Sequence, residues 1–159
     1  MKPNQQLTLD LAVLIARLAM GWTMIAHGAQ KFFEWGIEGT AAYMGAGGVP
    51  LPLVSASFAA AVELGGGVLL VLGALTRVAA LGMVAVMAGA FVFAQDSTTI
   101  FVQDDGYGYV MAVAVCCLLL AVLGSGKFGV DRLITERFGG ARAGTRRAEA
   151  GAGRRGTDS

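Results

Sequence analysis

Charged residues are scarce in this chain. Asp, Glu, Lys and Arg make up 14% of its 159 residues, whereas about 25% is usual for a soluble domain. So few charged side chains cannot cover the surface of a soluble domain of this size, and 55% of the residues are apolar. The scarcity therefore argues against an ordinary soluble fold and favours a protein whose exterior lies in lipid.

Cysteine and recognisable catalytic motifs are also rare. The two cysteines, Cys116 and Cys117, are adjacent within an apolar segment, which excludes a disulfide framework and a metal-binding spacing. Their role stays open, although a thiol in apolar surroundings remains protonated and unreactive. The sequence has no zinc motif, nucleotide fingerprint or hydrolase elbow, so it predicts no metal site.

Four apolar segments have about the length that a transmembrane helix needs, which is roughly 20 residues. The second and third are separated by a few residues around Thr76 and Arg77, so they must form an antiparallel hairpin. We therefore predict an all-α fold, an integral membrane bundle of four antiparallel helices, with a short interfacial helix near residues 40–44. The predicted spans are residues 9–29, 53–75, 78–94 and 107–123 within a domain at 9–133.

Basic residues predict an orientation for this bundle. Ten of the 12 Lys and Arg residues, all except Arg17 and Lys31, fall on one side of the four spans. Such residues concentrate on the cytoplasmic side of membrane proteins. We therefore predict that the N-terminal residues 1–8 and a disordered basic tail at 134–159 both lie in the cytoplasm. Nothing predicts nucleic-acid binding. The basic residues that we expect to set this topology are Arg77, Lys127, Arg132 and Arg137.

Two charged residues lie deep in the predicted spans. At 1.5 Å per residue, Arg17 lies about 12 Å into the first span, and Glu63 lies about 15 Å into the second from the opposite side. Both are therefore near the midplane of a hydrocarbon core about 30 Å thick, where a charge is costly and usually faces a partner. We predict an Arg17–Glu63 ion pair in the bundle interior, which either fixes helix register or forms a proton or ligand site.

A second polar group follows at the outer end of the first span. His27 and Lys31 are four residues apart and share a helical face, and Lys31 lies on nearly the same stripe as Arg17. Together with Arg17 and Glu63 they form a candidate site that could hydrogen-bond a quinone carbonyl or an anionic ligand. The alternative is that His27 and Lys31 are ordinary anchors at the membrane interface.

Glycine is abundant, with 24 residues. Within membrane spans, glycine lets helix backbones approach closely. We predict this packing role for two residues of the first span and two of the second: Gly21, Gly28, Gly65 and Gly66.

A set of mostly polar and glycine residues follows a particular order along the predicted spans and the segments between them. They are Arg17, Gly21, His27-Gly28, Lys31, Gly45 to Pro50, Glu63, Gly65-Gly66, Thr76-Arg77, Ala79-Ala80, Gly106-Tyr107, Gly124 to Lys127 and Asp131. This set resembles the DoxX family of small bacterial membrane proteins, over about residues 14–133. Two positions depart from the family: Gly108 and Gln95 stand where relatives often carry an acidic residue and a histidine.

The resemblance implies a four-helix protein of the bacterial inner membrane. The family's name is linked to a thiosulfate:quinone oxidoreductase, and other members are associated with oxidative-stress and thiol-redox systems. The resemblance therefore implies the membrane subunit of a quinone- or thiol-linked redox system, with quinone as the candidate cofactor. Its partners would be the lipid bilayer, soluble redox or oxidative-stress proteins, and a second copy of the chain.

Two other functions stay open at this point. The basic tail and the missing cofactor motif are also typical of a non-catalytic membrane scaffold for soluble partners. Charges within membrane spans are also typical of a small-solute transporter.

Overall fold

The computed structural model describes residues 3–93, 98–135 and 137. Within these ranges the chain is nearly all helical and has no β-strand, so the all-α prediction is confirmed for them. The elements are α1 (Pro3–Ala29), the π-helical turn η1 (Gln30–Glu34), α2 (Gly36–Ala46), α3 (Pro52–Leu72), α4 (Thr76–Phe93), the 3-10 turn η2 (Val102–Asp104) and α5 (Gly108–Leu123). Gln95 and most of the predicted tail at 134–159 lie outside the described residues, whereas Ile134, Thr135 and Arg137 at its start are helical rather than disordered.

Helix length and composition fit a membrane protein. Among the described residues, three helical segments are long and apolar enough to cross a bilayer, namely Pro3–Glu34, Pro52–Leu72 and Thr76–Phe93, and the apolar helix Gly108–Leu123 is shorter. Large apolar side chains are exposed along all of them, such as Ile15 on α1, Val78 on α4 and Val122 on α5. In lipid such an exterior carries no penalty, because the lipid tails are equally apolar.

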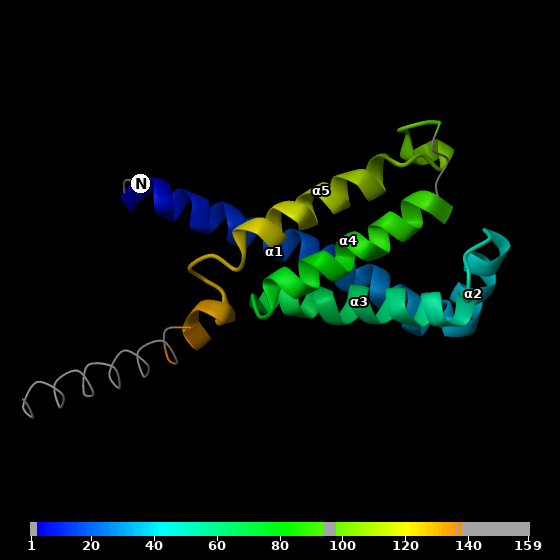
Figure 1. The fold of residues 1–159 in the computed structure, drawn as a ribbon, viewed down its shortest axis with the longest axis horizontal. Coiled ribbons are helices and arrows are strands. Elements are labelled where there is room, and N and C mark those ends of the chain that lie inside the picture. The colour runs from blue at the N-terminus through cyan, green and yellow to red at the C-terminus, as the bar shows by residue number, and fades with distance from the viewer. Residues whose placement is uncertain (1–2, 94–97, 136, 138–159) are drawn as a thin grey trace, which may run out of the picture.

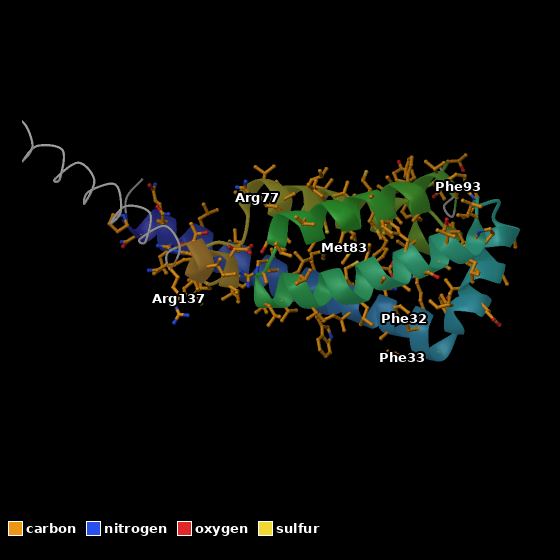
Figure 2. All side chains as sticks on the ribbon, turned by 60° about the horizontal axis from the view of Figure 1, so that its bottom comes forward. Phe32, Phe33, Arg77, Met83, Phe93 and Arg137 are labelled. Atoms are coloured by element: carbon orange, nitrogen blue, oxygen red, sulfur yellow. The ribbon has the colours of Figure 1, made fainter. Side chains whose placement is uncertain are left out.

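The four long helices lie side by side, and α2 lies at the end of the bundle where α3 begins (Figure 1). The expected short helix near residues 40–44 is therefore present, as part of α2. Met83 lies between α4 and α3 (Figure 2) and is fully buried. The apolar core around it draws on every long helix and includes Met24, Leu70, Val113 and Leu120.

Glycines bring the backbones of α1 and α3 into direct contact. A Cβ atom added at Gly28 would lie 2.4 Å from the backbone nitrogen of Leu64, and one at Gly67 would lie 2.7 Å from the carbonyl oxygen of Gly21. Neither helix can carry a larger residue at these points without moving apart. Gly21 and Gly28 thus have the close contacts that the sequence predicts, and Gly67 is a third contact glycine that the prediction omitted.

The two predicted packing glycines of α3 differ from each other. A Cβ atom at Gly66 would lie 3.0 Å from the Met83 methyl group on α4, whereas one at Gly65 would meet no atom within 4 Å. Gly65 is exposed, because it points about 200° around the helix from Gly67, at 100° per residue. Its predicted role in packing within this chain is therefore wrong.

The segment that follows α5 ties the helices together at the end where α3 meets α4. Asp131 accepts hydrogen bonds from the backbone N–H groups of Leu75 (2.6 Å) and Thr76 (3.0 Å). Its carboxylate thus satisfies donors that the first turn of α4 leaves unpaired. In the same segment, the N–H of Lys127 donates to Asp10 on α1, over 2.9 Å. Residues 124–131, called the closing segment below, therefore connect α1 to the α3–α4 turn.

The α1–α3 contact predicts that the same substitution will change stability differently at Gly28 and at Gly65, which both lie within helices. Gly28→Ala should lower the stability of the protein by about 1–3 kcal/mol, because the added methyl group forces α1 away from α3. Gly65→Ala is the matched control and should keep or raise stability, since alanine favours a helix by up to about 1 kcal/mol over glycine. Thermal unfolding in detergent, followed by circular dichroism, measures both. Equal midpoints for the two variants would contradict the contact.

The closing segment predicts a role for the Asp131 carboxylate. Asp131→Ala removes two hydrogen bonds to a charged group, each worth about 1.5–3 kcal/mol, and should release the segment from the α3–α4 turn. Trypsin should then cleave after Lys127 several times faster than in the unmodified chain. Thr135→Val is the control, because Thr135 donates only to the Asp131 backbone carbonyl. Unchanged cleavage of Asp131→Ala would rule out this role.

Candidate functional site

A buried ion pair joins Lys31 to Glu63. The Lys31 Nζ lies 2.6 Å from Glu63 Oε2, and the two side chains are only 13% and 5% exposed. The sequence analysis placed both residues in the candidate site but paired Glu63 with Arg17. The structure thus corrects the partner of Glu63.

Arg17 is at the other end of the bundle. Its Nε donates to the carbonyl oxygen of Leu70 (2.9 Å), Nη2 to that of Val71 (3.2 Å), and Nη1 to that of Ser125. These acceptors belong to the last turn of α3 and to the closing segment. A cation at a helix C-terminus is favourable, because the unpaired carbonyl groups carry partial negative charge. Gly73 makes room for it, since a Cβ there would lie 2.5 Å from Arg17 Cζ.

The wrong pairing has a simple geometric cause. The prediction measured depth from Leu9, but α1 begins at Pro3 and helical structure continues to Glu34. Because Gly28 packs on Leu64, the register of α1 on α3 sets Lys31 beside Glu63. Arg17 lies about 20 Å away from Lys31 along the helix axis. Arg17 and Glu63 therefore lie at different levels along the bundle axis, although their predicted depths in the membrane were similar.

A π-helical turn directs Lys31 towards Glu63. In η1 the N–H of Trp35 donates to the carbonyl of Gln30 over 3.0 Å, an i to i+5 bond that accommodates one residue more than an α-helical turn. Such turns are frequent at functional sites, because they change the direction of a side chain. The turn also leads α1 into α2, where Thr40 is buried and donates to the carbonyl of Gly36 over 2.9 Å.

His27 forms a separate polar contact. Its Nε2 lies 2.9 Å from the hydroxyl oxygen of Tyr109 in the first turns of α5, and the two ring centroids are 5.7 Å apart. Tyr109 is a polar partner of His27 that the sequence did not predict. The sequence does place the Tyr109 hydroxyl group within an apolar helix, and such a group needs a hydrogen-bonding partner. His27 thus connects α1 to α5.

A cavity of about 530 Å³ lies beside the Lys31–Glu63 pair. Most of its wall is apolar or aromatic, and α2, α3 and α4 all contribute to it. Lys31 and Glu63 supply its charged groups among the described residues, while His27, Tyr109 and Arg17 do not line it. The wall includes Trp35, Thr40, Tyr43, Met44, Phe58, Ala59, Met87, Ala90 and Phe93.

This arrangement suits a small ligand that is mostly apolar and has one polar group. Volumes of about 300–1,000 Å³ are typical of small-molecule sites, whose few polar groups fix the orientation of the ligand. Lys31 has three N–H donors, and Glu63 occupies one of them. The others are available to a carbonyl or anionic oxygen. The adjacent cysteines offer no comparable site, since Cys117 is fully buried and both are free thiols.

Comparisons with known proteins identify the family. The sequence profile of the DoxX family matches residues 12–96, more than half of the chain. The chain is 34% identical to "Inner membrane protein YqjF" of Escherichia coli (strain K12) over 137 residues, which cover 81% of this chain and 96% of the relative. It is 32% identical to "Inner membrane protein YphA" of the same organism over 125 residues, covering 76% and 88%. No solved structure matches the chain significantly.

The family profile spans the residues that build the site on α1, η1 and α3, and both relatives extend over most of the chain. Both relatives are inner membrane proteins, and the long apolar helices of this chain have the lengths that a membrane requires. The resemblance seen in the sequence is therefore confirmed: the chain belongs to the DoxX family and is an inner-membrane protein.

Proposed function

We propose that this protein binds a quinone in the cavity beside Lys31 and Glu63 and acts as the membrane subunit of a redox system. A soluble redox protein would be its electron donor. The observation that carries the proposal is a buried ion pair at the wall of an otherwise apolar cavity of about 530 Å³. A quinone has the matching chemistry, since its ring is apolar and its carbonyl oxygens accept hydrogen bonds.

The ion pair provides donors without a net charge. Lys31 alone in the cavity would favour anions, but Glu63 at 2.6 Å balances its charge. A neutral ligand that accepts hydrogen bonds is therefore preferred over a second carboxylate, which would repel Glu63. Desolvated ion pairs of this kind are costly to build, and in membrane spans they usually mark a functional site.

Bound quinone should change the fluorescence of one tryptophan. Trp35 lines the cavity, whereas Trp22 lies on α1 outside its wall and is 72% exposed. In a Trp22→Phe variant, a tailless benzoquinone should quench Trp35 fluorescence with saturation. Lys31→Gln combined with Glu63→Gln should weaken this binding at least tenfold, which corresponds to about 1.4 kcal/mol, because the strong donor is lost. The double variant leaves no unpaired charge in the site.

Two controls accompany this titration. Arg77→Gln removes a charge at the other end of the bundle and should leave the affinity unchanged. Trp35→Phe, which keeps Trp22, should abolish the saturable component. Quenching that never saturates in the Trp22→Phe protein would refute the quinone site.

We further propose that four helices cross the membrane with both termini in the cytoplasm. Arg77 and Arg137 lie at one end of the bundle, and Phe32, Phe33 and Phe93 lie at the other (Figure 2). The first end would be cytoplasmic, because Lys and Arg prefer that side. Lys31, at the second end, is the exception to this pattern, and it is paired with Glu63. With 16 residues, α5 is about 24 Å long, so the bilayer would thin slightly around it.

Reporter fusions test this orientation. Green fluorescent protein fused after Ser159 should fluoresce, and alkaline phosphatase at the same place should be inactive, because both would lie in the cytoplasm. Alkaline phosphatase inserted after Gly48, between α2 and α3, should be active. Phosphatase activity at Ser159 would reverse the orientation.

A further inference from the structure

The cavity has a side opening between α3 and α4. On α4, a Cβ atom added at Gly89 would meet no other atom within 4 Å, and the neighbouring wall residue Ala85 is exposed. On α3, Phe58 lines the cavity and is 54% exposed. These three residues, called the side opening below, have no charged group among them.

Nearer the α3–α4 turn the same two helices are in contact. A Cβ atom at Gly82 would lie 3.2 Å from Val62 Cγ1, and one at Gly66 would lie 3.0 Å from Met83 Cε. Figure 1 shows α3 and α4 diverging from their shared turn towards α2. The side opening therefore lies where α3 and α4 are farther apart. On α4 it begins about one to two helical turns after Gly82, at Ala85 and Gly89.

The cavity thus has a polar wall and an apolar exit. Glu63 and Lys31 form the polar wall, and from there to Ser55 the cavity extends along α3 for about 12 Å at 1.5 Å per residue. The exit through the side opening faces the lipid-exposed flank of α3 and α4. Across the end of the bundle, Thr40, Tyr43 and Met44 of α2 form part of the wall.

We infer that the ligand enters sideways from the lipid and keeps an apolar tail in the side opening. Resting on the proposed quinone site, this inference narrows the substrate class to quinones that carry an isoprenoid tail. The ring would lie against Lys31 and Glu63, and the tail would leave between α3 and α4. Because lipid tails are as apolar as this wall, the tail adds to the affinity through van der Waals contacts with α3 and α4 rather than by leaving water.

A bulky residue at Gly89 tests the route. In the Trp22→Phe background, Gly89→Phe should weaken the binding of an isoprenoid benzoquinone at least tenfold, because its ring fills the side opening. The affinity of a tailless benzoquinone should stay within about threefold. Gly65→Phe is the matched control, since Gly65 also faces open space but does not line the cavity. It should change neither affinity.

Ala85→Phe is a second blocking variant, made from the other turn of the same opening, and it covers the case in which Gly89→Phe fails to fold. If both folded variants bind the tailed quinone as tightly as Gly65→Phe does, the side route is wrong, while the quinone site remains. If the tailless quinone shows no saturable quenching in the parent protein, the proposed function fails instead. If an isoprenoid alcohol without a quinone ring binds as tightly as the tailed quinone, the cavity is a lipid-tail site and both proposals are overturned.

Discussion

The backbone contact between α1 and α3 determines where the charged groups of this protein lie. With glycines at both surfaces, neither helix can slide without a clash, since a Cβ at Gly28 or Gly67 already lies within 3 Å of the opposite backbone. This fixed register places Lys31 beside Glu63 and Arg17 beside the last turn of α3. A shift by one turn, about 5.4 Å, would separate the buried ion pair and leave two charges without partners.

The two ends of the bundle therefore use their charges differently. At one end, Arg17 and Asp131 are satisfied by backbone groups, and these bonds join α1, the α3–α4 turn and the closing segment. These hydrogen bonds keep the helices together at that end of the bundle. At the other end, Lys31 and Glu63 bind each other beside a cavity and retain hydrogen-bonding capacity towards it. The hydrogen bonds at the first end leave the second end free to hold a cavity, where the proposed ligand would bind.

The sequence alone predicted the helices and the membrane setting, because apolar length is a local property. Of the four polar candidates that it named, Lys31 and Glu63 line the cavity, whereas Arg17 and His27 do not. The sequence predicted the wrong partner for Glu63, because depth along a helix depends on where that helix begins, and Pro3 to Thr8 extend α1 beyond its apolar stretch. Tyr109 escaped notice for a related reason. Its importance comes from a contact with His27 across 82 positions, which no local pattern records.

The position of the cavity follows from the shape of the hairpin. Asp131 and the tight turn at Gly73 hold α3 and α4 together at one end, and small residues such as Gly66 keep them close for the next turns. From there α3 and α4 diverge towards α2 (Figure 1), and α2 fills the space between them only in part, which leaves the cavity. An apolar wedge in lipid would normally fill with lipid tails. Lys31 and Glu63 line this cavity, so under the proposed function they would favour a molecule that has both a tail and a hydrogen-bond acceptor over a lipid tail alone.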